Sequence, residues 1–508
     1  MSAGTPVAAL RWTDARLVLP AAACWLALLT VREWTPRGCF AACGVGVVSA
    51  LALIAFRRPW RLAVAVALIA AAGASGVAGI HAAARATGPL AALARQGAIV
   101  EMTVQLASDA VRRSAVDASS GRTYEYVLAR AQLTRLDHDG RQWAMRQPVL
   151  LIAPDRGWAG LLPSQRIRTA GRLSAPRVGD TVTAVVAIRG SPALIGEPSA
   201  LQRVAGRVRA GLRHASTPLP GDAGKLLPGL VDGDTAALPP DVTADFRTTG
   251  LTHLVAVSGT NVGIVGGVAL GLARRTRLRP GAAAAIAALC VVGFVVLARP
   301  SGSVLRAAVM GLLGLAGMAT SRPRQALSGV CGAVIVLLLV EPALAVQPGF
   351  ALSAFATLGL IVVAPGWAEW LERWWPQPVA VAVAVPAAAQ VACAPLIAMI
   401  GGGLSLVAIP ANLLAAPAVA PATVFGVCAA ALAPVAPFLA GLCAWVAALP
   451  CLFLLAVARC GARVPYASVP WPDGWHGAFL MAALTPIVVG LLWAASECGR
   501  LVEPIESR

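Results

Sequence analysis

A long apolar segment of the chain opens with the stretch Gly250-Leu251-Thr252-His253-Leu254-Val255-Ala256-Val257-Ser258-Gly259-Thr260-Asn261-Val262-Gly263. This stretch carries His, Ser, Asn and two Thr where a membrane-spanning helix is normally apolar. Polar side chains at membrane depth are costly, so they usually face the interior of a helical bundle or a water-filled path. The stretch therefore predicts a membrane helix, spanning about 251–272, with one polar face.

The whole chain has the composition of a membrane protein. Of its 508 residues, 58% are hydrophobic and 13% are charged, about half the usual charged share of ~25%. Apolar windows of about 20 residues, the length that crosses ~30 Å of hydrocarbon, recur throughout. We predict a polytopic α-helical membrane protein with about 10–12 transmembrane helices. The expected spans are near 17–31, 39–56, 62–80, 251–272, 281–298, 303–319, 326–340, 346–365, 378–398, 404–428, 432–458 and 477–495.

Basic residues between the apolar segments predict the orientation. Arg57, Arg58 and Arg61 crowd the turn between the second and third segments, which the positive-inside rule places in the cytoplasm. Three crossings then export the region that follows. The basic loops Arg274–Arg279 and Arg322–Arg324 fall two crossings apart, which is consistent with this orientation. We therefore expect a multi-pass protein of the cytoplasmic membrane with both termini in the cytoplasm.

The predicted domains are transmembrane helices in 1–80, an extracytoplasmic domain in 81–200, amphipathic or interfacial helices and a linker in 201–250, and a transmembrane channel domain in 251–508. The polar region 81–222 holds 19 Arg and 10 acidic residues. Apolar and polar residues alternate in the runs 98–107, 123–136, 147–153, 166–173 and 181–189. Alternation interrupted by glycine turns predicts a small all-β unit, and five strands are compatible with an OB-like barrel.

Two other segments are expected at the membrane surface. Residues 203–214 form a basic amphipathic pattern, and Trp367–Trp375 places four tryptophans among charged residues. The chain has 11 cysteines, but none lies in 81–222 and most lie in apolar segments. This distribution argues against a disulfide scaffold and a Cys-rich metal site, and we expect neither a metal nor a cofactor.

Several polar residues are candidates for function. On a continuous helix Ser258 and Asn261 share a face, with His253 nearby, although hydrogen-bonding between helices is an alternative role. Asp232 and Asp234 suit a cation site, a helix cap or a turn. Arg299 ends one predicted span, where it could snorkel to the interface.

Other candidates lie deeper in the spans and in the exported region. Arg306 lies a turn inside the next span, where it requires a partner or a wet cavity. In the exported region Tyr124 and Tyr126 share a strand face with Arg122 and Arg130, which suits stacking on bases and contact with phosphates. The alternative is that both tyrosines fill the barrel interior.

The run from Leu226-Leu227-Pro228-Gly229-Leu230-Val231-Asp232-Gly233-Asp234 to Phe246, together with the opening stretch, resembles the central motif of ComEC-type competence proteins. This family forms the inner-membrane channel through which transforming DNA enters bacteria. The resemblance extends to Arg299-Pro300-Ser301-Gly302-Ser303-Val304-Leu305-Arg306, to Pro348–Leu360 and to Pro410–Pro417, which contains Asn412. One departure is Asn261, where relatives usually have His, so proton transfer at that position is not expected.

The resemblance implies an extracytoplasmic OB-like domain and a role as a membrane channel that translocates single-stranded transforming DNA. The expected path is lined by Asp234, His253, Ser258, Asn261, Arg299, Arg306 and Asn412. Binding would be independent of base sequence and sensitive to salt. Membrane lipid, an external DNA receptor and a second copy of the chain are further expected partners.

No enzymatic activity is expected of the chain itself. Gly224-Lys225 is followed by Leu226, so there is no Walker A loop, and motive force is assigned to a separate ATP-driven helicase in the cytoplasm. The five histidines are scattered, so the metal motif of the metallo-β-lactamase-like domain found in many relatives is not recognised. Strand degradation is therefore assigned to a separate nuclease.

Two other functions remain open. A transporter or flippase for a lipid-linked or polysaccharide substrate would also use helices broken by Gly and Pro and inward-facing Arg. An intramembrane serine protease would need Ser258 to pair with His253, but five residues on one helix place them on different faces.

Overall fold

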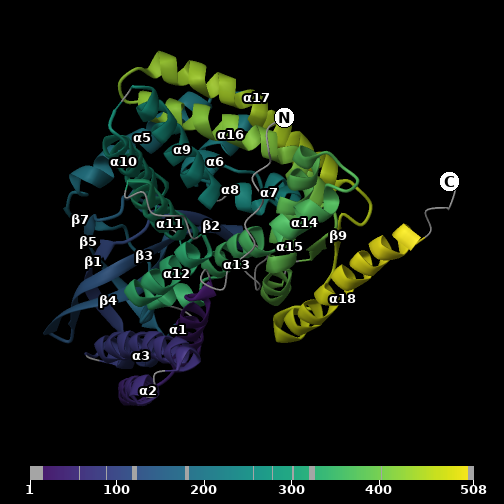
Figure 1. Ribbon diagram of the computed structural model, residues 1–508. Coiled ribbons are helices and arrows are strands. Elements are labelled where there is room, and N and C mark those ends of the chain that lie inside the picture. Colours follow the sequence, from purple (N-terminus) through teal and green to yellow (C-terminus); the bar gives the residue numbers. More distant parts are fainter. Residues whose placement is uncertain are drawn as a thin grey trace, which may run out of the picture.

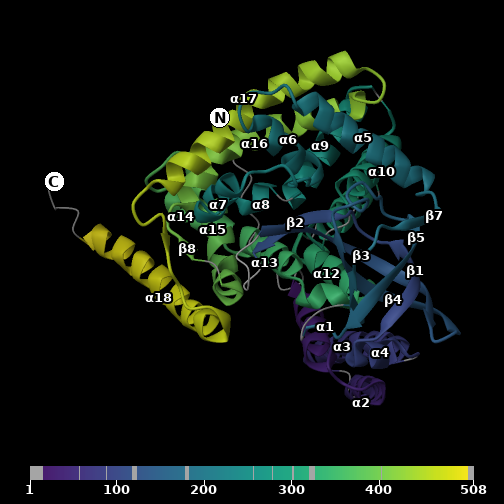
Figure 2. The ribbon, with the colours of Figure 1, turned by 180° about the vertical axis from the view of Figure 1, so that it is seen from behind.

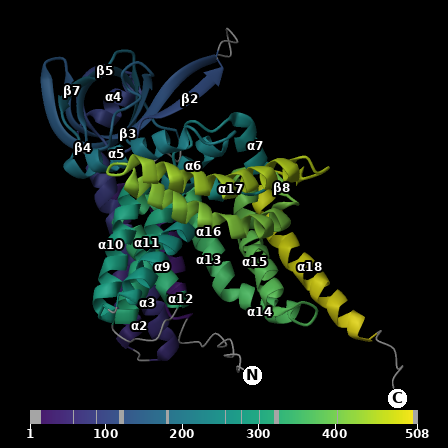
Figure 3. The same ribbon diagram turned by 90° about the horizontal axis from the view of Figure 1, so that it is seen from above.

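The computed structural model describes residues 15–55, 58–86, 88–116, 123–177, 182–255, 257–276, 278–299, 302–319, 326–401 and 403–501. Helices make up most of the molecule, and a β domain lies at one end of them (Figure 3). Of the residues expected to bind nucleic acid, Arg122 falls outside these ranges. The basic turn Arg322–Arg324 also falls outside them.

Three N-terminal helices pack together beside the β domain: α1 Val18–Val31, α2 Pro36–Ala55 and α3 Pro59–Ala86. They correspond to the first three predicted spans. Their buried side chains join those of α12 (Ala326–Val340) in one apolar core, which includes Cys24, Leu28 and Val334. Trp25 donates a hydrogen bond of 2.9 Å from Nε1 to the carbonyl oxygen of Ala345, which ties α1 to the helices far along the chain.

The β domain begins with the short helix α4 (Leu90–Gln96) and contains every strand predicted from alternation. The predicted strands are β1 Ile99–Leu106, β3 Thr123–His138, β4 Arg141–Pro154, β5 Arg166–Ser174 and β6 Ala184–Ile188. Two further strands, β2 Val111–Val116 and β7 Ala193–Gly196, were not predicted. Alternate residues of β1 and β5 are buried, as a sheet with one face on a core requires.

The strand pairings close on themselves. The order is β1-β3-β4-β6-β5, and β5 pairs with β1, so five strands form a ring. All of these pairs are antiparallel except β4 with β6. Gly171 on β5 lies where a Cβ atom would be 2.9 Å from the carbonyl oxygen of Ala187, so only glycine allows this close approach. The interior is filled by a core that includes Trp158 and Ile167.

Four helices connect the β domain to the rest: α5 Ala200–Ser216, α6 Ala223–Asp232, α7 Pro240–Thr248 and α8 Thr252–Val255. The helix predicted at 203–214 is therefore present as α5. The long helices α16 (Ala408–Leu432) and α17 (Pro437–Ala462) lie side by side and pack on α5, α6 and α7. They run across the other helices rather than along them (Figures 1 and 3).

The remaining helices are α9 Gly259–Arg275, α10 Pro280–Ala298, α11 Gly302–Ala319, α13 Pro348–Val362, α14 Ala364–Leu371, α15 Gln377–Ile400 and α18 Gly474–Leu501. The 3-10 helix η2 (Pro342–Val346) precedes α13, and β8 (Leu404–Ser405) pairs with β9 (Ser468–Val469). Helix α18 packs against α15 and extends away from the other helices (Figures 1 and 2).

Among the described residues, the helices that are long and apolar enough to cross a membrane are fewer than the 10–12 predicted. Within the described residues six qualify, and the pair α13 and α14, bent by 45°, would make a seventh. The six lie in α2, α3, α10, α15, α16 and α17. Three of the other predicted spans form shorter helices, since α1, α9 and α12 have 14, 17 and 15 residues. The tryptophan-rich segment, predicted to be interfacial, belongs partly to α14.

The opening stretch is not one continuous helix, which corrects the predicted span 251–272. Helix α8 ends at Val255, and α9 begins at Gly259 with Ser258 as its N-cap. The Ser258 side chain accepts a hydrogen bond from the backbone N–H of Asn261. Serine competes for local backbone hydrogen bonds and favours such caps, so the polar residues that mark this stretch also start its main helix.

Candidate nucleic-acid path

Tyr124 and Tyr126 lie on the outer face of the β domain. Val127 and Ala129, whose side chains alternate with theirs along β3, are buried in the domain core. Tyr124 is 53% exposed and Tyr126 is partly buried, and their ring centroids are 5.8 Å apart. The structure therefore does not place these two rings inside the domain, which was the alternative considered from the sequence.

Two arginines lie on the same face of the ribbon as the two rings. Arg113 on β2 lies directly opposite Tyr126 on β3, and residues opposite each other in an antiparallel pair share a face. Arg130 is exposed on the same strand, with the parity of Tyr124 and Tyr126. We refer to Arg113, Tyr124, Tyr126 and Arg130 as the ribbon face. Two π faces beside two guanidinium groups suit the stacking of bases and the binding of phosphates.

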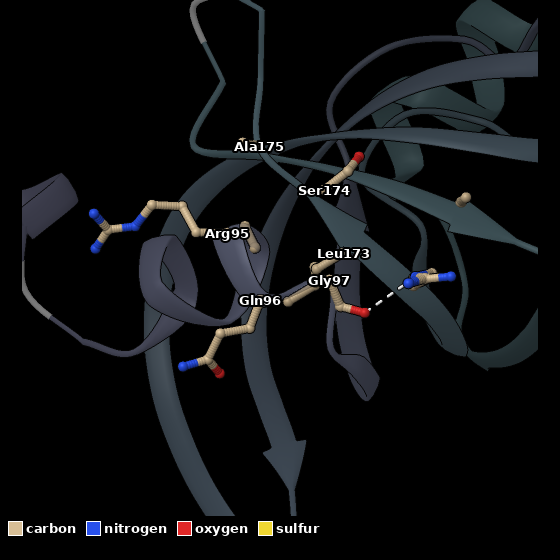
Figure 4. A pocket seen from close by; sticks show the side chains of 9 residues that line it. Arg95, Gln96, Gly97, Leu173, Ser174 and Ala175 are labelled. Atoms are coloured by element: carbon tan, nitrogen blue, oxygen red, sulfur yellow. Dashed lines mark hydrogen bonds between the residues drawn. The ribbon is translucent and has the colours of Figure 1, made fainter.

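A shallow pocket of about 410 Å³ lies elsewhere on the β domain, between α4 and β5 (Figure 4). Arg95 and Arg172 are among the side chains that line it, and Arg172 donates a hydrogen bond of 3.1 Å to the carbonyl oxygen of Gly97. None of the residues predicted from the sequence lines this pocket.

A network of charges joins the β domain to the helices beneath it. Asp109, in the connection between β1 and β2, accepts two hydrogen bonds of 2.7 Å from Arg299, which follows α10. Arg209 of α5 lies 3.7 Å from both Asp109 and Asp232 and donates hydrogen bonds to the carbonyl oxygens of Asp232 (2.6 Å) and Leu297 (2.9 Å). Arg299 thus makes a bidentate ion pair with Asp109, in addition to any placement of its charge at the membrane interface.

The two aspartates of the Asp-Gly-Asp sequence have separate roles. Asp232 is the last residue of α6, and its buried Oδ1 accepts a hydrogen bond of 3.0 Å from the backbone of Asp234. Asp234 accepts from the backbone of Ala236 and pairs with Arg213 at 3.1 Å. Burial raises the pKa of the Asp232 carboxyl from 3.8 to about 6, against the opposing charge of Arg209. The described residues hold no cluster of three or more His, Cys, Asp or Glu side chains suited to a metal ion.

Asn261 connects three helices. It is 2% exposed, and its Nδ2 donates a hydrogen bond of 2.8 Å to the carbonyl oxygen of Leu230 in α6. Its Oδ1 lies 3.3 Å from the hydroxyl of Ser258 and 3.5 Å from that of Thr423 in α16. These contacts agree with the role in hydrogen-bonding between helices that the sequence left open.

His253 and Asn412 are not brought to this cluster. The ring Nδ1 of His253, on the exposed side of α8, lies 3.1 Å from the carbonyl oxygen of Gly250. Asn412 donates to the carbonyl oxygen of Ala408 within its own helix α16. Ser258 and His253 make no hydrogen bond to each other in the described part of the chain, so the geometry gives the serine protease alternative no nucleophile paired with a base.

Three residues of the predicted path are charged: Asp234, Arg299 and Arg306. Of these, Arg306 is the most deeply buried. It is 4% exposed on α11 and donates hydrogen bonds to the Ser353 hydroxyl of α13. Its position inside a helix agrees with the prediction, whereas the nature of its partner could not be predicted.

Sequence reasoning missed three residues that the structure brings to this region: Arg113, Asp109 and Arg209. Asp109 and Arg299 are 190 positions apart, and no local pattern links them. Arg113 lies in β2, whose sequence Val-Arg-Arg-Ser-Ala-Val lacks the alternation that marked the other strands. Arg209 was assigned to the basic face of an amphipathic helix, and only tertiary packing shows that it is buried at 9% exposure.

Taken together, the helices and the inserted sheet define a multi-pass helical membrane protein with a separate β domain. The family model described as competence protein matches residues 230–496, which is more than half of the chain. The chain belongs to this competence protein family and is of the ComEC type.

A characterised relative covers part of the same chain. ComE operon protein 3 of Bacillus subtilis (strain 168) is 31% identical over 144 residues, which are 28% of this chain and 19% of that protein. The chain therefore matches about a fifth of the length of this relative. No solved structure matches the chain.

Proposed function

We propose that this protein translocates single-stranded transforming DNA across the cytoplasmic membrane. The observation that carries the proposal is the ribbon face, where two outward-facing tyrosines and two arginines share one face of a β domain that adjoins apolar helices. Membership of the competence protein family supports a role in DNA uptake. Phosphate contacts by Arg and base stacking by Tyr recognise DNA without reading its sequence.

The β domain is proposed to be an OB-like barrel. Its ring of five strands, with β4 and β6 parallel and all other pairs antiparallel, is consistent with a small Greek-key barrel. Such barrels bind oligonucleotides on an open face and in neighbouring loops. Strand β3 belongs both to the ring and to the ribbon face. A bound DNA strand would therefore have one continuous surface to follow.

The proposed orientation places the β domain outside the cytoplasmic membrane and both termini inside. Arg274 and Arg275 end α9 at the opposite end from Ser258, and the positive-inside rule assigns them to the cytoplasm. Strand degradation and motive force would come from a separate nuclease and a cytoplasmic ATP-driven helicase. An external DNA receptor, membrane lipid and a second copy of the chain complete the proposed partners.

The proposal is tested by uptake of end-labelled duplex DNA in cells with and without the gene. Deletion is expected to leave DNA bound outside and to abolish DNase-resistant label inside. The double variant Tyr124→Ala/Tyr126→Ala is expected to reduce internal label, because each base stacked on an aromatic ring contributes about 1–3 kcal/mol.

Tyr466→Ala is the matched control, since Tyr466 is 83% exposed and lies outside the β domain. This variant is expected to take up DNA normally. Normal internal label in the deletion strain would overturn the channel and favour the transporter or flippase for a lipid-linked or polysaccharide substrate.

A further inference from the structure

Arg306 is a buried cation that pairs with no acidic side chain in the described part of the chain. Its side chain is 4% exposed, and it lies one turn inside α11. Among the residues that the structure describes, its hydrogen-bond partners are the Ser353 hydroxyl and, at 3.0 Å from Nη1, the Met310 sulfur. None of the ion pairs found among those residues includes Arg306. A charge removed from water requires a compensating charge, and hydroxyl and thioether groups supply none.

A second positive field lies beside it. A Cβ atom built on Gly259 would be 3.6 Å from Nη2 of Arg306 and 3.1 Å from the Cβ of Ala307, so the first turn of α9 lies directly against this part of α11. The first N–H groups of a helix lack partners within the helix, and its N-terminus carries a partial positive charge. A helix N-terminus and an arginine repel each other unless an anion lies between them.

Hydroxyl groups complete the surroundings. Ser303 and Ser353 are 3.0 Å apart through their Oγ atoms, and both are partly buried beside Arg306. A hydroxyl can donate to an anion while it accepts from a guanidinium. Thr260, at the start of α9, is exposed, so the first turn of α9 reaches the molecular surface.

The cluster lies where a strand leaving the β domain would meet the helices. Arg299 contacts Asp109 of the β domain, and α11 begins at Gly302, three residues later. Arg306 is four residues further on, which corresponds to about 6 Å along a helix. The ribbon face and this cluster would therefore be successive contacts for one polymer.

We propose that Arg306, Ser303, Ser353 and the first turn of α9 bind a phosphodiester monoanion, supplied by the backbone of the DNA strand as it enters the membrane. This inference rests on the proposed function for the source of the phosphodiester, and on the geometry for its chemistry. Arg suits this ligand because its planar fork donates two parallel hydrogen bonds to phosphate oxygens.

The chemistry is tested with dimethyl phosphate, a small phosphodiester, added to the purified full chain in detergent at constant ionic strength. Dimethyl phosphate is expected to raise the unfolding temperature of the unaltered protein and of Arg203→Gln, an exposed arginine paired with Glu197. Arg306→Gln should abolish the rise, whereas Arg306→Lys should retain part of it, since lysine keeps the charge without the fork. An equal rise in Arg306→Gln would overturn the site.

The variant Ser353→Ala separates an anion site centred on Arg306 from a purely structural link between α11 and α13. Ser353→Ala removes the hydroxyl that links α11 to α13 and one donor to the anion but leaves both positive fields, so it should lower stability and reduce the rise with dimethyl phosphate without abolishing it. Loss of the rise in Ser353→Ala together with an unchanged rise in Arg306→Lys would contradict an anion site centred on Arg306.

The source of the phosphodiester is decided separately. Binding of a thymidine oligonucleotide and of micelles containing phosphatidylglycerol is compared in the Tyr124→Ala/Tyr126→Ala variant with and without Arg306→Gln. Weakening of oligonucleotide affinity by roughly tenfold in Arg306→Gln supports DNA as the source. If binding of phosphatidylglycerol depends on Arg306 but binding of the oligonucleotide does not, DNA is overturned as the source. The response to dimethyl phosphate would still establish the site itself.

Discussion

At the scale of single residues, burial decides what the charged groups do. Asp232 has no exposed side-chain surface, and its Oδ2 has no hydrogen-bond partner among the described residues. The Arg209 guanidinium is 3.7 Å away, too far for a strong hydrogen bond. The cost of removing the carboxylate from water therefore exceeds the attraction of this neighbour, and the pKa of Asp232 is raised to about 6.

This raised pKa predicts a pH dependence of stability. Between pH 3.8 and about 6 the folded protein holds a proton at Asp232 that the unfolded chain has lost, so the free energy of unfolding falls as pH rises through this window. Each unit of pKa difference corresponds to about 1.4 kcal/mol. Asp232→Asn should flatten this dependence, as measured by unfolding temperature in detergent from pH 4 to 7.

Asp222→Asn is the control for this experiment. Hydrogen bonds from Lys225 and Arg459 lower the pKa of Asp222, so its stabilisation is present above pH 3.8 and is lost only below it. Asp222→Asn should therefore leave the slope between pH 4 and 6 unchanged. Equal slopes in the unaltered protein and Asp232→Asn would show that Asp232 is ionised in the fold throughout this range.

At the scale of elements, close approach between helices depends on particular glycines. Gly359 of α13 faces α15, where an added Cβ atom would lie 2.7 Å from the carbonyl oxygen of Ala388 and 2.8 Å from the Cβ of Ala392. The first of these atoms belongs to the backbone and cannot turn aside. Gly349 of the same helix has no neighbour within 4 Å of such an atom. Small residues allow helices to approach closely in membranes, where packing drives association.

Gly359→Ala is therefore expected to destabilise the protein by about 1–3 kcal/mol, the usual cost of overpacking, through separation of α13 from α15. Gly349→Ala should be neutral or slightly stabilising, because alanine favours helix more than glycine does. The measurement is chemical unfolding in detergent for both variants. A smaller loss for Gly359→Ala than for Gly349→Ala would contradict the close packing of α13 on α15.

At the scale of the whole molecule, the β domain and the basic end of α9 are expected on opposite sides of the membrane. An epitope inserted after Gly140, in the turn between β3 and β4, should bind antibody in intact spheroplasts. An epitope inserted after Thr276, among the basic residues that follow α9, should bind only after permeabilisation. The reverse pattern would place the β domain in the cytoplasm and overturn the proposed export.

The sequence by itself determined the membrane class, the positions of most helices and the five strands of the ring. These features depend on hydropathy and on periods of 2 or 3.6 residues, which are local properties of the chain. The motif around Ser258 also indicated the family, because it combines several residues in a fixed order. It did not reveal that the helix breaks before Gly259, since serine is compatible with both a helix interior and an N-cap.

Only the tertiary structure decided which side chains meet. Alternation placed Tyr124 and Tyr126 on one face of a strand, but the packing of Val127 and Ala129 inward is what turns that face outward. Pairing of Asp109 with Arg299 and burial of Arg306 against α9 join segments that no local period connects. The physical reason is that a side chain's neighbours across space are fixed by the packing of whole elements, whereas its own element is fixed by the residues next to it.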